Sequence, residues 1–337
     1  MSFLPFLHAV ADHRNLSAAE AREAMEGILK GEVSSAQIAA FLVALRMKGE
    51  TAEELVGFAR AMRHMAVRVD AGLDGEVLLD TCGTGGDGCA TFNISTIAAF
   101  VVAGAGVRVA KHGNRSISSR CGSADLLESL GIAVTIPPEK VAQAIRDVGI
   151  GFLFAPALHT AMKHAQPVRI ELKMRTVFNL LGPLTNPAGA TAQLVGAPSE
   201  HAAELMAGAL AQLGLQHGFV VHGSDGLDEI TTTGSTLVFE IASGRVGRGV
   251  VNPGDFGVVQ AQPSDLAGGD KEQNATIARD ILGGAKGARQ DIVLVNAAAA
   301  LVAAGKAREF REAMQIARAS IDSGAAQAKL VQLARFR

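Results

Sequence analysis

The sequence contains no tryptophan and no tyrosine, so its 14 phenylalanines are the only large aromatic side chains available to a hydrophobic core. Hydrophobic residues nevertheless make up 48% of the 337 residues, while aromatic residues make up 4%. Small aliphatic side chains must therefore fill most of the interior. A chain of this length exceeds what one compact core usually holds, so two lobes are expected. The 38 glycines indicate many tight turns, as in a fold rich in strand–helix units.

Neither sign of charge dominates the sequence. The 31 lysines and arginines nearly balance the 33 aspartates and glutamates, which gives a formal net charge of −2. A general nucleic-acid-binding protein would carry an excess of positive charge, so no nucleic-acid partner is expected. A polyanionic small ligand would need local positive charge, which Lys111, Arg115 and Arg120 can supply.

Cysteine is also scarce. Cys82, Cys89 and Cys121 form an odd-numbered set without Cys-x-x-Cys spacing, which argues against a disulfide framework and against a zinc site. The N-terminus lacks the positively charged region of a signal peptide. The uncharged run 88–107 is long enough to mimic a membrane helix, but its first half is polar. These features predict a cytoplasmic protein with no membrane partner.

No GxxxxGK[ST] motif occurs in the chain, which excludes a P-loop nucleotide hydrolase. The most informative stretch is instead residues 77–123. An apolar run ends at Asp80, a glycine-rich turn follows at 83–87, and the polar residues 93–96 lead into a long apolar run. A second short strand then ends in the sequence KHGN at 111–114. This order predicts one βαβ unit whose two loops lie at the same edge of a parallel sheet.

The two predicted loops carry the chemistry of a phosphate site. Glycines allow positive φ and let backbone N–H groups approach a ligand closely, and a helix N-terminus offers free N–H donors. Ser95 and Thr96 are natural helix caps with additional hydroxyls, and Lys111 adds a full positive charge. Together they predict a phosphate or pyrophosphate cradle at the carboxyl ends of parallel strands. The GxGxxG match at 83–88 is weak by itself, because Asp87 would repel a dinucleotide pyrophosphate and a structural turn is the alternative.

The remaining chain shows helical and strand patterns in turn. Four helices are expected within 1–68, three of them opened by capping boxes at Ser17, Ser34 and Thr51. Residues 71–75 form a candidate hinge. Further strands are expected at 134–136, 151–154, 194–196, 218–221, 237–241 and 245–251, with a short strand inside the loop 253–270. Further helices are expected at 125–130, 139–148, 199–213, 274–282, 291–304 and 310–321.

Two charged clusters stand outside the first loops. Asp228 and Glu229 follow a strand end on the side of the phosphate cradle. Adjacent acids in a loop are often only solvated, but carboxylates together with phosphate oxygens and waters are the ligands that Mg²⁺ prefers. Residues 160–180 contain a basic cluster that includes Arg169. Such a cluster usually marks a solvated helix face, whereas a guanidinium is also suited to bind a carboxylate bidentately.

Six motifs together resemble one family, the anthranilate phosphoribosyltransferases. The motifs are GTGGDG at 83–88, NIST at 93–96, KHGNRS at 111–116, GSADLLESLG at 122–131, RTVFNLLGPLTNP at 175–187 and GLDEI at 226–230. They follow the family's order and spacing over nearly the whole chain. That family transfers the 5-phosphoribosyl group of phosphoribosyl pyrophosphate to the amine of anthranilate, the second step of tryptophan biosynthesis from chorismate.

The resemblance implies a fold and a domain organisation. A small all-helical lobe and a larger α/β lobe with a mainly parallel central sheet, like nucleoside phosphorylases, would place the active site in the cleft between the lobes. The helical lobe would comprise 1–70, with 163–188 returning to it. The α/β lobe would comprise 75–162 and 189–337, joined through the hinge at 71–75. The family also implies a homodimer.

The resemblance further assigns residues to the two substrates and to Mg²⁺. Phosphoribosyl pyrophosphate would contact Gly83, Gly86, Asp87, Thr91, Asn93, Ile94, Ser95, Thr96, Lys111, His112, Gly113, Asn114, Arg115, Ser116, Ile117, Ser118, Ser119 and Ser123. Anthranilate would contact Gly83, Asn114, Arg169, His112 and His159, and the metal would be held by Ser95, Asp228 and Glu229. No acid or base residue is expected, because an aromatic amine is already neutral at pH 7. Lys111 would act by electrostatic stabilisation of the departing pyrophosphate.

Two other functions are compatible with parts of the pattern. A pyrimidine nucleoside phosphorylase has the same fold and a glycine loop near a lysine. The loop sequences GTGGDG and KHGN and the Asp228-Glu229 pair nevertheless favour a pyrophosphate donor. A non-catalytic nucleic-acid-binding relative would need a basic face and eroded motifs. The net charge of −2 and the intact motifs argue against it.

Overall fold

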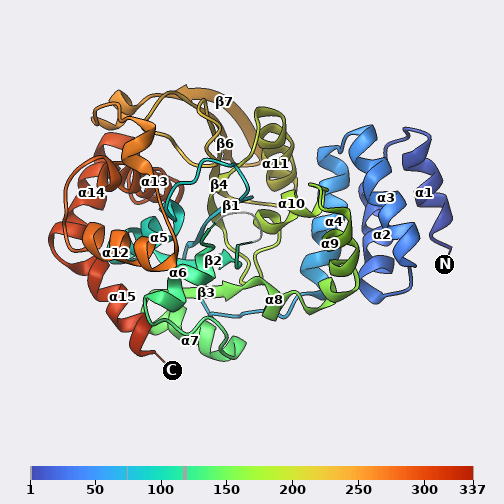
Figure 1. Ribbon diagram of the computed structural model, residues 1–337, viewed down its shortest axis with the longest axis horizontal. Helices are drawn as coiled ribbons and strands as arrows, with labels where there is room; N and C mark the ends of the chain where they lie inside the picture. The colour runs from blue at the N-terminus through green and yellow to red at the C-terminus, as the bar shows by residue number, and fades with distance from the viewer. Residues whose placement is uncertain (1, 74, 117–119, 337) are drawn as a thin grey trace.

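The computed structural model describes residues 2–73, 75–116 and 120–336. A helical bundle occupies one end of the molecule, and a seven-stranded sheet covered by further helices occupies the other (Figure 1). The bundle consists of α1 (Leu4–Ala11), α2 (Ala18–Lys30), α3 (Ser35–Lys48) and α4 (Ala52–Met65). The three predicted capping boxes, at Ser17, Ser34 and Thr51, are confirmed.

The sheet has the strand order β3-β2-β1-β4-β5-β6-β7. Its strands are β1 (Leu78–Gly83), β2 (Arg108–Gly113), β3 (Ile150–Phe154), β4 (Ala192–Gly196), β5 (His217–Gly223), β6 (Thr236–Ala242) and β7 (Arg245–Val251). The pairs among β1 to β5 are parallel, whereas β5–β6 and β6–β7 are antiparallel. The predicted fold class, a helical lobe with a mainly parallel α/β lobe, is therefore confirmed.

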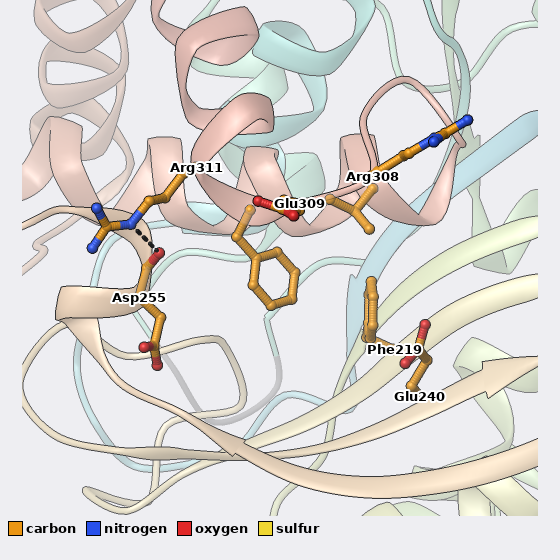
Figure 2. Close-up of a pocket in the computed structure, with 8 residues that line it drawn as sticks. Phe219, Glu240, Asp255, Arg308, Glu309 and Arg311 are labelled. Atoms are coloured by element: carbon orange, nitrogen blue, oxygen red, sulfur yellow. Dashed lines mark hydrogen bonds between the residues drawn. The ribbon is translucent and has the colours of Figure 1, made fainter.

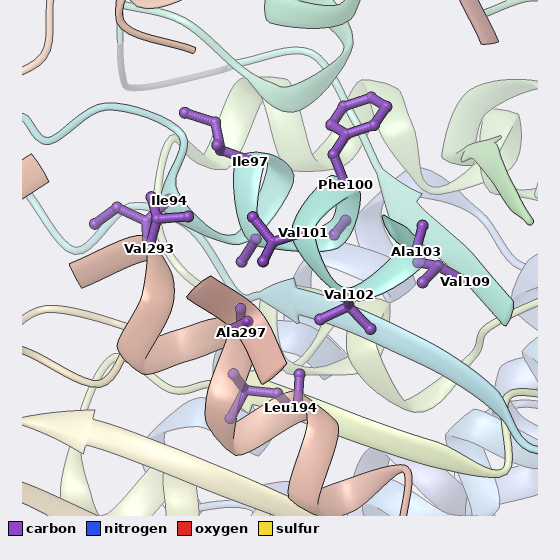
Figure 3. Close-up of a cluster of buried hydrophobic side chains, with 14 of the residues drawn as sticks. Ile94, Ile97, Phe100, Val101, Val102, Ala103, Val109, Leu194, Val293 and Ala297 are labelled. Carbon is purple, nitrogen blue, oxygen red and sulfur yellow. The ribbon is translucent and has the colours of Figure 1, made fainter. Parts of the chain in front are cut away.

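Helices cover the sheet on both sides. They are α5 (Ile94–Gly104), α6 (Ser123–Ser129), α7 (Pro138–Asp147), α11 (Glu200–Gln212), α12 (Lys271–Leu282), α13 (Ala288–Ala303), α14 (Phe310–Asp322) and α15 (Ala325–Arg335). Figure 3 shows Val101 and Val102 of α5 gathered with Ala297 of α13 in one core. Because alanines line much of α13, this helix packs closely, and small side chains fill the interior as the composition predicts.

A connecting segment lies between the bundle and the sheet (Figure 1). It contains α8 (Ala155–Leu158), η1 (Thr160–His164), α9 (Gln166–Leu172), α10 (Phe178–Leu181) and η2 (Gly182–Leu184). Helix α9 packs against α3, and η1 packs against α2. One hydrophobic cluster contains bundle side chains, Val168 of α9, side chains of α11 and Val220 of the sheet. The apolar core therefore runs without a break from the bundle to one face of the sheet.

Some sequence-based expectations are wrong. Residues 134–136 form no strand; Val134 is 4% exposed and packs into the core from a loop between Gly131 and Pro137. The segment 253–270 contains η3 (Pro253–Phe256) and η4 (Pro263–Leu266), and its expected strand reduces to a single bridge between Ala267 and Thr91. Helix α15 was not anticipated.

The start of α5 also differs from the expectation. Helix α5 begins at Ile94 after an N-cap at Asn93, whose side chain makes no capping hydrogen bond. Ser95 and Thr96 therefore lie inside the first turn and do not cap the helix. Within the described part of the chain, no helix has both the length and the apolar character needed to cross a membrane.

Candidate active site

The site forms where β1 and β2 end side by side. These strands are parallel, so the loop after Gly83 and the segment Lys111-His112-Gly113 leave the same edge of the sheet. Thr81 of β1 fixes the start of α5 against this edge, because its Oγ1 donates to the Ser95 carbonyl at 3.0 Å. The βαβ unit predicted from the sequence thus brings the glycine loop, a helix start and Lys111 together.

Lys111 is a buried cation that points to the start of α5. The residue is 3% exposed, and its Nζ donates to the Thr81 carbonyl at 2.5 Å and to Ser95 Oγ at 3.4 Å. A lysine removed from water in this way costs free energy unless acceptors and negative charge surround it. Lys111 therefore holds a positive charge at a fixed point beside the glycine loop.

Asp228 and Glu229 reach the same point from the loop after β5. Asp228 Oδ2 accepts a hydrogen bond from the Gly85 N–H at 2.8 Å, and Glu229 Oε1 accepts one from the Ser95 N–H at 3.0 Å. Burial raises the pKa of both carboxyls, with Asp87 adding to the effect at Asp228 and Asp228 adding to it at Glu229. Lys111 opposes the rise in the pKa of Glu229. The two carboxylates thus concentrate negative charge that a single lysine only partly offsets.

Two glycines make room for Asp228. A Cβ atom on Gly83 would lie 2.4 Å from Asp228 Oδ2, and a Cβ atom on Gly196 would lie 1.6 Å from the Asp228 carbonyl oxygen. Both distances are far below van der Waals contact, so the backbone at these positions must carry no side chain. Sequence reasoning missed Gly196, because the need for a glycine there arises from a residue 32 positions further along the chain.

The acidic pair fits a hard divalent cation. Among the described residues, no group of three or more His, Cys, Asp or Glu side chains is arranged to hold a metal. Two adjacent carboxylates with the Ser95 hydroxyl nearby are nevertheless oxygen ligands of the type that Mg²⁺ takes, with phosphate oxygens and waters completing its shell. Burial and repulsion by a neighbouring carboxylate raise the pKa of Asp228 and of Glu229, and a bound cation would oppose both effects.

His112 and His159 form a buried pair, with ring centroids 5.2 Å apart. Burial lowers the pKa of His112 to about 4 and that of His159 to about 3, so both rings are neutral at pH 7. His112 Nδ1 lies 3.1 Å from the Gly182 carbonyl, which can only accept, so Nδ1 carries the proton. The Nε2 atoms of both rings are buried without a partner. His112 Nε2 is therefore available as an acceptor to a bound molecule.

Arg169 projects from α9 and has no acidic partner among the described residues. Its Nη1 donates weakly to Gln166 Oε1 at 3.4 Å, and its guanidinium carbon lies 5.2 Å from the centre of the Phe178 ring. Burial lowers its pKa. A half-buried guanidinium held over an aromatic ring, with most of its donors unused, can bind a carboxylate.

The structure places Arg115 differently from the other predicted phosphate ligands. Its guanidinium donates to Asp125 at 3.1 Å and bidentately to Glu128, with both distances at 2.6 Å, and it lies over the Phe154 ring. The side chain is thus engaged by α6 and not directed to Lys111. Ser123 braces the same loop, because its Oγ accepts from the Asn114 N–H and donates to the Asn114 carbonyl.

The remaining predicted ligands lie around the start of α5. Asn93 Nδ2 donates to the Cys121 carbonyl at 3.0 Å, and Asn93 Oδ1 accepts from Asn274 at 3.1 Å. Ile94 and Thr96 are each 1% exposed, so both are buried at the start of α5. Ser116 N–H donates to Asp125 at 3.1 Å. The predicted ligands Ile117, Ser118 and Ser119 lie outside the described residues.

Two further buried residues organise the site and were not predicted. Asp80 is fully buried; its Oδ1 accepts from the His112 N–H at 3.0 Å and its Oδ2 accepts from Asn186 Nδ2 at 2.7 Å. Asn186 also donates to the Ala110 carbonyl at 2.9 Å. Burial raises the pKa of Asp80, and the charge of Lys111 opposes this. The sequence held one signal for the role of Asp80, which is that a single acidic residue directly follows an apolar run.

A separate cavity of about 440 Å³ lies between β5–β6 and the start of α14. Phe219, Phe310, Arg308 and Arg311 are among its lining residues, and none of the predicted site residues is. Figure 2 shows the side chains of Arg308 and Arg311 extending in opposite directions, with Arg311 hydrogen-bonded to the Asp255 carbonyl. The two arginines of this cavity do not point toward a common position, so we assign the cavity no role.

Two family models match the chain. The helical bundle domain of the glycosyl transferase family matches residues 4–66, and the a/b domain of that family matches residues 75–327. The fold and the site therefore define a two-domain glycosyltransferase.

Individual relatives narrow this class. The chain is 69% identical over 336 residues to an anthranilate phosphoribosyltransferase of Solibacter usitatus, covering 100% of this chain and 99% of the relative. The crystal structure of anthranilate phosphoribosyltransferase from Thermus thermophilus has a TM-score of 0.93 at 45% identity, covering 98% of both chains. The Saccharomyces cerevisiae enzyme in complex with PRPP and Mg has a TM-score of 0.90 at 30% identity, covering 98% of this chain and 96% of that one. This chain belongs to the anthranilate phosphoribosyltransferase family, which confirms the resemblance seen in its motifs.

Proposed function

We propose that this protein transfers the 5-phosphoribosyl group of phosphoribosyl pyrophosphate to the amine of anthranilate. The products are N-(5-phosphoribosyl)anthranilate and pyrophosphate, the second step of tryptophan biosynthesis from chorismate. The observation that carries the proposal is the meeting of Lys111 with the Asp228-Glu229 pair at the edge where β1 and β2 end. A fixed cation beside undercompensated carboxylates suits a ligand that is itself a polyanion bound with a divalent metal.

On the donor side, the chain supplies N–H groups and one buried ammonium. The glycine loop, the segment 91–96 and the segment 111–116 with Ser123 would surround phosphoribosyl pyrophosphate. Lys111 would stabilise the negative charge that develops on the departing pyrophosphate, and its burial makes that interaction stronger than it would be in water. Positioning and leaving-group electrostatics would supply most of the rate.

Asp228, Glu229 and Ser95 would hold Mg²⁺, which when bound neutralises charge on the pyrophosphate. The related Saccharomyces cerevisiae structure was solved with PRPP and Mg. In this chain, Ser95 Oγ lies 3.4 Å from Lys111 Nζ, so the serine would sit between the lysine and the acidic pair.

On the acceptor side, Arg169 would bind the carboxylate of anthranilate. Asn114 and Gly83 would lie beside the ring, and the two neutral histidines, His112 and His159, would line the approach. Neither histidine is charged at pH 7, so neither would repel the guanidinium or compete with it for the carboxylate. The aromatic amine needs no base to become nucleophilic, because it is already neutral.

The domain division stays part of the proposal. We place the helical lobe at 1–70 with 163–188, the α/β lobe at 75–162 and 189–337, and a hinge at 71–75. The packing of α9 on α3 supports the return of the connecting segment to the bundle. Substrates that bind between two lobes are usually enclosed by a movement of the lobes.

A homodimer formed by the helical lobe is also proposed. Leu4 of α1, Met47 of α3 and Ile170 of α9 are large apolar side chains with 44%, 74% and 61% of their surface exposed. Helix α3 packs against both α1 and α9, which brings these elements to one lobe. Such exposed apolar groups are typical of interfaces. Among the described residues, Cys82, Cys89 and Cys121 form no disulfide, which fits a reducing compartment and supports a cytoplasmic location.

The reaction can be followed directly by anthranilate fluorescence, since the chain has no Trp and no Tyr to contribute background. The protein is incubated with anthranilate, phosphoribosyl pyrophosphate and Mg²⁺. Loss of fluorescence that requires all three components is the expected result. Asp228→Asn combined with Glu229→Gln should abolish the magnesium-dependent turnover. No loss of signal from folded protein, or release of free base from thymidine or uridine with phosphate, would contradict the proposal.

A further inference from the structure

Arg175 joins the glycine loop to the segment that packs on the helical bundle. It lies between α9 and α10, and its guanidinium donates to the Gly86 carbonyl at 2.9 Å and to the Gly85 carbonyl at 3.1 Å. The carbonyl of Arg175 in turn accepts a hydrogen bond from the guanidinium of Arg46, near the C-terminal end of α3. A line of hydrogen bonds therefore runs from the bundle through Arg175 to the loop.

These contacts fix the direction of two peptide units. Gly85 and Gly86 have φ values of +68° and +72°, which glycine adopts without strain. The Gly85 N–H donates to Asp228, while its carbonyl faces Arg175. In a planar trans peptide the C=O and N–H groups point in opposite directions. Because Arg175 holds the carbonyls of Gly85 and Gly86, the N–H groups of Gly86 and Asp87 are turned away from the guanidinium.

Those two N–H groups are free to bind a ligand. Three other loop donors are occupied: Thr84 N–H donates to Gly196, Gly85 N–H to Asp228 and Cys89 N–H to Asp87. In the part of the chain that the structure describes, no hydrogen bond uses the N–H of Gly86 or of Asp87. Successive N–H groups in a turn of this kind form a concavity that binds anionic oxygens.

We propose that Arg175 is a positioning residue that sets the glycine loop in the conformation that binds phosphoribosyl pyrophosphate. It does so without touching the donor, by orienting the N–H groups of Gly86 and Asp87, and it ties that orientation to the helical bundle through Arg46. This inference rests on the proposed function, which assigns the glycine loop to the donor substrate. The role needs a guanidinium, because its two Nη atoms each donate to one of the two carbonyls in a fixed plane. The single ammonium of a lysine cannot reproduce this geometry.

The test compares Arg175→Ala, Arg175→Lys and Arg46→Ala with the matched control Lys173→Ala. Lys173 is an exposed basic residue of the same segment, two positions before Arg175. For each variant, kcat and the KM of each substrate are measured with Mg²⁺ present, together with the thermal unfolding midpoint. Arg175→Ala should raise the KM of phosphoribosyl pyrophosphate roughly tenfold or more, the loss expected for hydrogen bonds from a charged donor.

The KM of anthranilate should stay within about twofold, since Arg175 contacts none of the residues assigned to its carboxylate, and Arg175→Lys should not restore the donor KM. Arg46→Ala should raise the donor KM by about two- to threefold, because it removes only the anchor of Arg175. Equal changes in both KM values, full rescue by lysine, or an Arg175→Ala variant that matches Lys173→Ala would overturn the inference. An unchanged donor KM in Arg46→Ala would overturn the link to the bundle. Failure of the proposed function is distinct, because the wild-type protein would then show no turnover.

Discussion

Asn186 donates to the fully buried carboxylate of Asp80 at 2.7 Å, and the same carboxylate accepts the backbone N–H of His112. The two side chains are separated by 106 positions in the sequence. Their contact joins the chain just after the connecting segment to β1 and β2. It lies next to His112, which is assigned to both substrates. Asp80 thus fixes the backbone position of His112 in the KHGN segment, although its own side chain is buried away from the site.

Replacing Asn186 with alanine should destabilise the protein by about 2–5 kcal/mol, because the Asp80 carboxylate and the Ala110 carbonyl both lose a buried donor. Urea unfolding measures this change. Gln327→Ala serves as the control, since Gln327 is exposed on α15 and should change the free energy of unfolding by no more than about 0.5 kcal/mol. A fully stable Asn186→Ala variant would contradict the role assigned to this contact.

Replacing Arg169 with alanine should weaken anthranilate binding by about 10- to 100-fold, the loss expected for charge-assisted hydrogen bonds to a carboxylate. Binding of phosphoribosyl pyrophosphate should change by less than about threefold, because Arg169 lies on α9 and not at the sheet edge. Calorimetric titration with each substrate measures both. Lys163→Ala, at an exposed basic position nearby, is the control. Equal weakening of both substrates would refute the assignment.

The buried histidine pair predicts acid sensitivity. The pKa of His112 falls to about 4 and that of His159 to about 3 on burial, against an ordinary value of 6.5. Below pH 6.5 the unfolded chain therefore binds protons that the folded protein does not, so stability is full above pH 6.5 and falls as the pH drops toward 4. The slope should reach about 1.4 kcal/mol per pH unit for each histidine.

Urea midpoints between pH 4 and pH 7.5 test this prediction. His112→Gln and His159→Gln should each flatten the pH dependence, whereas replacement of the exposed His13 should leave it unchanged. A wild-type profile that is flat across this range would show that the two rings are not held neutral.

Replacing Gly196 with alanine should disrupt the acidic pair, because the new methyl group would overlap the Asp228 carbonyl oxygen. We expect a loss of about 1–3 kcal/mol in unfolding free energy from overpacking, and the loss of magnesium-dependent turnover. Gly247→Ala is a matched strand control, since a Cβ atom at Gly247 meets nothing within 4 Å. If the two variants behave alike in unfolding and activity assays, the close approach of Asp228 to β4 does not matter for function.

The parts of the site that the sequence predicted are those that local pattern determines. The glycine loop and the Asp228-Glu229 pair follow strands β1 and β5, and Lys111 lies in the second half of β2; parallel strands bring such ends to one edge. The contacts of Asp80 with Asn186 and of Arg175 with Gly85 could not be predicted, because they join residues 106 and 90 positions apart through the tertiary fold.

The wrong predictions have a similar cause. The apolar residues 134–136 suit a strand, yet the core accepts Val134 from a loop because packing requires only burial of the side chain. Ser95 was a reasonable helix cap by residue type, but its N–H binds Glu229, and the helix begins one position earlier. The role of Arg115 as a phosphate ligand stays a prediction; in this structure its guanidinium is hydrogen-bonded to Asp125 and Glu128 of α6.

The hydrophobic cluster that the bundle shares with α11 and the sheet bears on how the molecule comes apart. Two lobes with separate cores could melt in succession, but here neither can lose its packing without exposing apolar surface of the other. Unfolding should therefore be a single cooperative event, although the chain matches two family models. Any movement of the bundle relative to the sheet must also be a bend within continuous packing, since a clean separation would expose buried Val168 and Val220 to water.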